Sequence, residues 1–209
     1  MFEHAISDRL FLLIQRLSKI AEIADTFYMA GGTALALYLG HRQSNDLDFF
    51  SEKDFNTEKY AQIVLKLGGT IIEEETGTLH AVIDNTKVSF IHYPYRLIKP
   101  LKQELGIRLA SIEDIACMKV IAILQRGEKK DFFDIYEILK RFSPLMIKEM
   151  ILEKYGDKKI NCYHVLKSFF YFDEADKTLD PVSLNDTSWD DVKEYFLKNE
   201  ATLTEGLLC

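Results

Sequence analysis

The sequence contains few cysteines, few prolines and no long apolar run. Its three cysteines, Cys117, Cys162 and Cys209, are odd in number and far apart. This spacing argues against a disulfide framework or a zinc site and predicts reduced thiols in a cytoplasmic protein. No segment approaches the roughly 18 apolar residues that a membrane-spanning helix needs. The first residues lack a basic region followed by an apolar core, so we expect neither a signal peptide nor a membrane partner.

Basic residues are also in the minority, because 26 lysines and arginines face 33 aspartates and glutamates, for a formal charge of −7. This excess argues against general coating of nucleic acid, although it leaves room for a local basic patch. The five histidines show no metal-ligand spacing. His80 and His92 fall on predicted strands, where we expect packed or surface residues.

The spacing of apolar residues predicts an α+β protein, with a small mixed sheet in the first half and helices in the second. The first half is predicted to hold helices at 4–24, 33–39 and 57–67, strands at 27–30, 46–50, 70–75, 78–84 and 87–93, and an edge strand at 107–110. The second half is predicted to hold helices at 111–125 and 130–142, further helical segments from 145 onward, and core aromatic residues at 169–172. We expect two regions, residues 1–110 and residues 111–209.

Residues 31–50 read G-G-T-A-L-A-L-Y-L-G-H-R-Q-S-N-D-L-D-F-F. On a strand, Asp46 and Asp48 would share one face, with Leu47 directed into the core. Two neighbouring carboxylates repel each other, and a divalent cation such as Mg²⁺ is the simplest compensation. A solvated turn is the alternative interpretation of the pair.

A glycine pair, Gly31 and Gly32, stands between a predicted strand and a predicted helix. The free N–H groups of a helix N-terminus attract phosphate, and glycine allows a ligand to approach the backbone closely. Ordinary turn geometry would also explain the pair. The order of strand, glycine turn, helix and D-x-D strand is more specific than either motif alone, because it places a phosphate cradle beside a metal site.

A second group of charged residues lies in the predicted helices 111–125 and 130–142. Lys119 is surrounded in sequence by apolar residues, so its ammonium group either extends to the surface or meets an anion. Asp131 and Asp134 share one helical face, where they could serve a site or simply complement the helix dipole. Arg42 and Lys130 could contact a nucleotide or could be ordinary surface residues.

Together these two blocks resemble the signature of the AbiEii/AbiGii-type nucleotidyltransferase toxins, within the DNA polymerase β-like nucleotidyltransferase superfamily. The second block reads I-E-D-I-A-C-M-K-V-I-A-I-L-Q-R-G-E-K-K-D-F-F-D-I-Y-E-I-L. The resemblance covers roughly residues 25–142. It implies a polymerase β-like nucleotidyltransferase core within residues 1–110, followed by the helical region 111–209.

The resemblance also implies roles for individual residues. Asp46 and Asp48 would hold Mg²⁺ or Mn²⁺ on a nucleoside triphosphate. The implied catalytic residues are Asp46, Asp48, Lys119 and Asp134, and the implied nucleotide-binding residues are Gly31, Gly32, Thr33, Arg42, Lys119, Lys130 and Asp131. Enzymes of the superfamily commonly carry a third carboxylate on a later strand, where K-V-S-F-I-H-Y of this chain offers Ser89. Toxins of this type also tend to lack that acid, so the resemblance is compatible with activity but argues against a full two-metal site.

The resemblance points to RNA, in particular a tRNA end, as one class of acceptor, and to an antitoxin encoded by an adjacent gene. An RNA acceptor would need a basic rim, for which Arg42, Arg126, Lys129 and Lys130 are the nearest candidates in sequence. A protein hydroxyl is an alternative acceptor. Two other hypotheses remain: a catalytically inactive nucleotide-binding module, which the missing third carboxylate favours, and a domain that only binds a partner.

Overall fold

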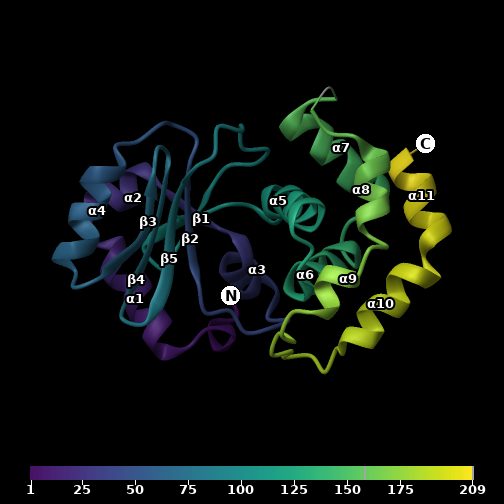
Figure 1. Cartoon of the computed structure of the whole chain (residues 1–209), viewed down its shortest axis with the longest axis horizontal. Coiled ribbons are helices and arrows are strands. Elements are labelled where there is room, and N and C mark those ends of the chain that lie inside the picture. The colour runs from purple at the N-terminus through teal and green to yellow at the C-terminus, as the bar shows by residue number, and fades with distance from the viewer. Residues whose placement is uncertain (158, 209) are drawn as a thin grey trace.

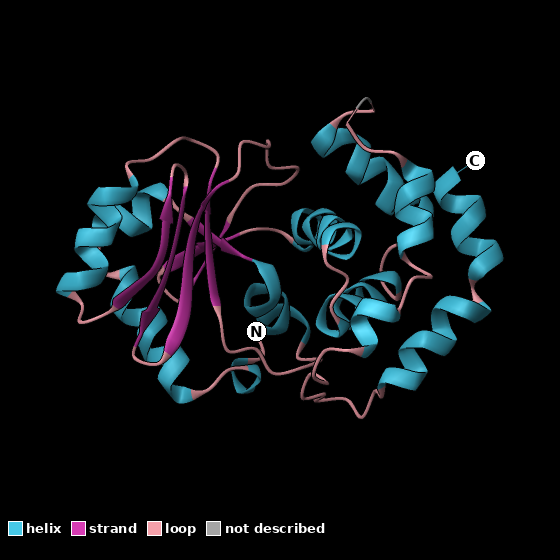
Figure 2. Cartoon of the chain, viewed as in Figure 1, coloured by secondary structure: helices cyan, strands magenta, loops and turns pink. Residues whose placement is uncertain are grey.

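The first half of the chain is built around a seven-stranded mixed sheet (Figures 1 and 2). The computed structural model describes residues 1–157 and 159–208, so the predicted thiol of Cys209 lies outside the described residues. The strand order is β3-β4-β5-β2-β1-β7-β6. The strands are β1 (Tyr28–Ala30), β2 (Leu47–Ser51), β3 (Thr70–Glu75), β4 (Thr78–Ile83), β5 (Thr86–His92), β6 (Lys102–Glu104) and β7 (Ile107–Leu109). The predicted α+β class is confirmed.

Residues 107–110 were predicted to form an edge strand, but the corresponding strand, β7, lies inside the sheet. It pairs in parallel with β1 on one side and antiparallel with β6 on the other, so β6 forms the edge. Leu105 and Gly106 join β6 to β7, and both have positive φ, as a two-residue hairpin turn requires. Strand β6 consists of polar Lys-Gln-Glu, which gave no apolar signal in the sequence.

The predicted helix at 4–24 is divided into three pieces. These are η1 (Glu3–Ala5), α1 (Asp8–Ser18) and α2 (Ala21–Thr26). The Ser7 hydroxyl accepts a hydrogen bond from the Leu10 N–H, which starts α1 at Asp8, and the extended backbone of Ile20 separates α1 from α2. Apolar spacing continues across these breaks because Ile6, which follows η1, lies in the same core as residues of α1 and α2.

Two further helices flank the sheet on opposite faces. Helix α4 (Thr57–Lys66) packs on β3 and β4, on the same side as α1 and α2 (Figure 1). Helix α3 (Gly31–Leu39) follows β1 directly and packs on β1 and β2 from the other side. Because α3 also contacts α5 and α6, it joins the sheet to the helical half.

The second half of the chain is helical, as predicted. Its helices are α5 (Ile112–Gln125), α6 (Lys129–Leu139), α7 (Pro144–Tyr155), α8 (Cys162–Ser168), α9 (Asp173–Asp176), α10 (Trp189–Lys198) and α11 (Glu200–Leu208). The rings of Phe132, Phe172, Trp189 and Phe196 form one aromatic cluster, and the fully buried Phe169 packs edge to face on Phe196. One cluster of buried apolar residues extends from the sheet into these helices. Among the described residues, no helix is both long enough and apolar enough to cross a bilayer.

Candidate active site

A cleft of about 620 Å³ lies where the sheet meets the helical half. Strands β2, β4 and β5, helices α5 and α6, and the segment 178–182 before α10 all contribute to its walls. Its acidic residues include Asp46 and Asp48, and its basic residues are Arg42, Lys87, Lys119, Arg126 and Lys130. The cleft therefore combines a pair of carboxylates with a group of cations.

Asp48 lies on β2, between β1 and β5, and is paired in register with Ala30 of β1 and Ser89 of β5. Asp46 precedes β2 by one residue, so the strand predicted from Asp46 begins at Leu47. Burial raises the pKa of Asp48, the charge of Lys119 lowers it, and the nearby charge of Asp46 raises it again. The two carboxylates are thus close enough to repel each other.

These two residues fit a hard divalent cation only in part. Within residues 1–157 and 159–208, the structure contains no group of three or more histidine, cysteine, aspartate or glutamate side chains that could hold a metal. Mg²⁺ is often held by one or two carboxylates together with substrate phosphates. Asp46 and Asp48 match that donor set, and Ser89 stands in register with Asp48 where a third acid would complete it.

The glycine pair makes room for charged side chains of the site. Gly31 has a φ of +72°, and a Cβ there would lie 2.7 Å from Oδ2 of Asp48. A Cβ on Gly32 would lie 2.5 Å from a terminal nitrogen of Arg42. Gly32 lines the cleft, whereas Gly31 is not among its lining residues.

Thr33 is buried beneath the loop that leads to β2. Its hydroxyl donates a hydrogen bond to the carbonyl of Asp46 and lies 2.8 Å from Oγ of Ser44. Thr33 does not line the cleft. Its contacts fix the backbone that carries Asp46.

Asp131 and Asp134, on α6, are fully buried and surrounded by cations. Nζ of Lys119 lies 3.0 Å from Oδ1 of Asp131 and 2.6 Å from Oδ2 of Asp134. Burial alone would raise the pKa of Asp134, but the charges of Arg42 and Lys119 hold it well below its usual range. Burial also raises the pKa of Asp131, but the charge of Lys119 and the hydrogen bonds of Arg126 hold it below its usual value. Both carboxylates therefore favour the ionised form and fix Lys119, which lines the cleft.

Two arginines are fixed by the same carboxylates. Arg42 binds Asp134 with Nε and a terminal nitrogen, at 2.7 and 2.8 Å, and His41 Nε2 lies 2.7 Å from the same carboxylate. Arg126 binds Asp131 in the same two-point manner, at 2.9 and 3.0 Å. Arg42, Lys119 and Arg126 line the cleft, whereas the two aspartates lie behind them and do not.

Three of the four residues predicted to form a basic rim line the cleft, and the fourth, Lys129, does not. Arg42, Arg126 and Lys130 line the cleft. Lys129 does not, because its ammonium group lies 2.7 Å from Oδ1 of Asp180 and its side chain is largely buried. Lys130 is half-exposed and pairs with Glu128 at 2.9 Å.

The chain matches the family model of the nucleotidyl transferase AbiEii toxin of type IV toxin–antitoxin systems, over residues 13–99 and 81–201. It belongs to this family. An uncharacterized protein of Aquifex aeolicus (strain VF5), aq_aa25, is 36% identical over 182 residues, which cover 83% of this chain and 86% of that protein. The family predicted from the two sequence blocks is confirmed.

Solved structures show the same fold at low sequence identity. JHP933 from Helicobacter pylori superposes with a TM-score of 0.55 at 19% identity, covering 97% of this chain and 94% of its own. MenT4, the nucleotidyltransferase toxin Rv2826c from Mycobacterium tuberculosis H37Rv, gives 0.50 at 12% identity, covering 95% and 82%. The polymerase β-like nucleotidyltransferase fold is thereby confirmed for this AbiEii-family chain.

Three features of the cleft in this AbiEii-family protein were not predicted from the sequence. His80 and Lys87 line it, and so does the segment 178–182 from the helical half. The position of His80 could have been inferred by laying the hairpin of β4 and β5 beside β2, because His80 then stands opposite Ser89. The segment 178–182 gave no such signal, since the backbone contacts that Val182 and the next residues, Ser183 and Leu184, make with residues 41–43 are long-range.

Proposed function

We propose that this AbiEii-family protein transfers a nucleotidyl group from a nucleoside triphosphate to an acceptor hydroxyl and acts as the toxin of a toxin–antitoxin pair. One observation carries the proposal. Asp46 and Asp48 share a single cleft with Arg42, Lys119 and Arg126. A triphosphate needs both features, because its oxygens bind cations while its magnesium ion binds carboxylates.

The fixed cations would bind and orient the triphosphate. Lys119 and Arg42 are held by buried carboxylates, so their positive ends would meet phosphate charge without first having to be ordered. Arg126 and Lys130 would extend this binding toward the cleft opening. Asp46 and Asp48 would hold Mg²⁺ or Mn²⁺, and the ion would neutralise charge that develops on the phosphate oxygens.

RNA, in particular a tRNA end, is the acceptor that we propose, in a cytoplasmic protein with an adjacent antitoxin gene. Basic side chains at the cleft support a polyanionic acceptor despite the net charge of −7. The second candidate function is a nucleotide-binding module without catalysis. Ser89, in place of a third carboxylate beside Asp48, is the observation that favours it.

A labelling experiment separates these functions. The protein is incubated with each α-³²P-labelled nucleoside triphosphate, Mg²⁺ or Mn²⁺, and either total RNA or a protein extract. Label in RNA that is lost in Asp48→Asn supports the proposal. Label in protein instead of RNA would show that the acceptor is a protein hydroxyl. Triphosphate binding without transfer would indicate the inactive module, and absence of triphosphate binding would indicate a domain that binds only a partner.

A further inference from the structure

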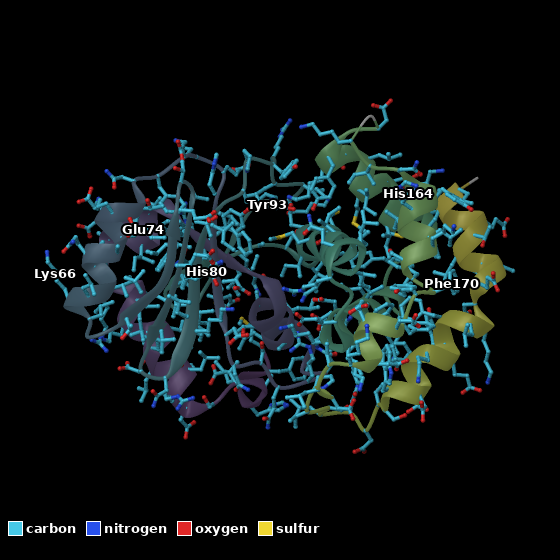
Figure 3. All side chains as sticks on the ribbon, viewed as in Figure 1. Lys66, Glu74, His80, Tyr93, His164 and Phe170 are labelled. Carbon is cyan, nitrogen blue, oxygen red and sulfur yellow. The ribbon has the colours of Figure 1, made fainter. Side chains whose placement is uncertain are left out.

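Three neighbouring strands place His80, Ser89 and Asp48 in one row on the floor of the cleft. His80 of β4 is in register with Ser89 of β5, and Ser89 is in register with Asp48 of β2. Side chains directly opposite each other on paired strands share one face of the sheet. All three residues line the cleft, and Figure 3 labels His80 on these strands.

Hydrogen bonds along this row determine which nitrogen of His80 carries the proton. Ser89 hydrogen-bonds to the side chain of Asp48. A cation held by Asp48, as the proposed function requires, would keep that carboxylate ionised, and because an ionised carboxylate can only accept, the Ser89 hydroxyl would donate to it. Ser89 has a single O–H, so its oxygen must accept from His80, whose Nδ1 lies 3.0 Å from Oγ. Nδ1 of a neutral His80 therefore carries the hydrogen, and Nε2 keeps a free lone pair.

The other side chains of the cleft that could accept a proton are already paired with a cation or assigned to one. Glu128 pairs with Lys130 and Arg126, and Asp180 pairs with Lys129. Asp46 and Asp48 are the carboxylates that the proposed function assigns to the cation. Among the described side chains of the cleft that can act as a base, this leaves Nε2 of His80 without a hydrogen-bond partner or an ion to hold, because the amide oxygens of Gln43 and Asn45 are not bases.

We propose that His80 is the general base of the transfer, an inference that rests on the proposed function. Nε2 takes the proton of the acceptor hydroxyl while its oxygen forms a bond to the α-phosphorus. The bond from the α-phosphorus to the oxygen that bridges to the β-phosphorus breaks, and pyrophosphate leaves with the electron pair. His80 then releases the proton to solvent, and Ser89 keeps the imidazole in the required tautomer throughout.

The test compares two variants that differ in one property. The amide of His80→Asn can still donate to Ser89 in the place of Nδ1 but cannot accept a proton, whereas His80→Ala can do neither. General base catalysis contributes about 10²- to 10⁴-fold, so kcat for transfer to total RNA should fall by that range in both variants. Triphosphate affinity by calorimetry and the melting temperature should stay near wild type. His92→Asn, the same change at the end of β5 outside the cleft, is the matched control.

Each remaining outcome overturns a different statement. A wild-type rate in His80→Asn together with loss in His80→Ala would assign His80 a positioning role instead of a catalytic one. Wild-type rates in both variants would remove it from the mechanism. A wild-type protein that binds triphosphate but transfers nothing would overturn the proposed function itself. The role of His80 as general base would then fall as well.

Discussion

Arg42 and Asp134 form a buried two-point ion pair, with Nε–Oδ1 and terminal nitrogen–Oδ2 distances of 2.7 and 2.8 Å, although 92 residues separate them in sequence. The pair joins the loop between α3 and β2 to helix α6. It therefore fastens the sheet half of the molecule to the helical half at the wall of the cleft. A buried pair of this kind adds little net stability compared with apolar residues of similar size. Removing one partner, however, strongly destabilises the fold, because the other charge stays buried without a partner.

The first prediction concerns removal of that central carboxylate. Asp134→Ala should lower the free energy of unfolding by about 3–5 kcal/mol, because Arg42 and Lys119 would remain buried without their shared partner. Urea unfolding followed by circular dichroism measures the change. Glu194→Ala, which removes the partner of Lys198 in an exposed ion pair of α10, is the control and should cost less than about 1 kcal/mol. Equal losses in the two variants would contradict the buried network.

The second prediction follows from the lowered pKa of Asp134. In the unfolded chain this carboxyl takes up a proton near its ordinary pKa of about 3.9, whereas in the folded protein it stays ionised to lower pH. The unfolded state then binds more protons, so the stability that Asp134 contributes is complete above that value and is lost as the pH falls below it.

Urea unfolding at a series of pH values between 5 and 3 tests this dependence. The free energy of unfolding should fall more steeply in wild type than in Asp134→Asn, whose amide does not titrate. Asp48, whose pKa burial raises, contributes in the opposite direction, but it is present in both proteins and drops out of the comparison. Parallel curves would show that Asp134 does not have a lowered pKa.

Local sequence signals predicted most of the sheet. Alternating apolar residues and turn residues located β3, β4 and β5 closely, and the turn residues Asp84 and Asn85 have the positive φ of a two-residue hairpin. Prediction was poorer where tertiary contacts override local pattern. Strand β6 is polar and exists because it pairs with β7, and the break at Ile20 lies inside an unbroken apolar spacing.

The site was predictable to the extent that its residues are close in sequence. Asp46, Asp48 and Gly32 were named from one motif, and the structure places all three at the cleft. Asp131 and Asp134 were named from their helical spacing, but only the fold reveals that they lie behind Lys119 and Arg42. Their assigned roles, like those of the other site residues, remain predictions.

The third prediction separates two effects of a glycine. Gly31→Ala should destabilise the fold by about 1–2 kcal/mol, because an L side chain at positive φ is strained. Its Cβ would also press on the Asp48 carboxylate, so Mn²⁺ affinity in the presence of triphosphate should fall. Gly68→Ala shares the positive φ but meets nothing within 4 Å, so it should cost similar stability and leave Mn²⁺ affinity unchanged. Equal Mn²⁺ affinities in both variants would remove Gly31 from the site.

The fourth prediction concerns Arg126, whose half-exposed side chain is fixed by Asp131 at the cleft. Arg126→Gln should weaken triphosphate binding about tenfold, equivalent to about 1.4 kcal/mol, and should leave nucleoside binding unchanged, because only the triphosphate carries charge for it to meet. Calorimetric titration with both ligands measures this split. Arg16→Gln, at a similarly exposed arginine that pairs with Asp84, is the control. Equal weakening toward both ligands would make Arg126 a structural residue.

The fifth prediction concerns the acceptor and uses Lys87, an exposed lysine of β5 that lines the cleft. If RNA docks there, the logarithm of its affinity should fall linearly with the logarithm of salt concentration, because each neutralised phosphate releases counterions. Lys87→Gln should then reduce this slope by about one, as expected for the loss of one phosphate contact. Filter binding of total tRNA at several salt concentrations measures both slopes.

Lys66 provides the control for net charge in the same experiment. It is exposed on α4, across the sheet from the cleft, and Figure 3 labels it at the far end of the molecule. Lys66→Gln changes the net charge of the protein by the same amount, so it should leave the slope as in wild type if docking is local. Identical slopes in Lys66→Gln and Lys87→Gln would mean that RNA does not dock at the cleft, and a protein hydroxyl would then be the acceptor to test.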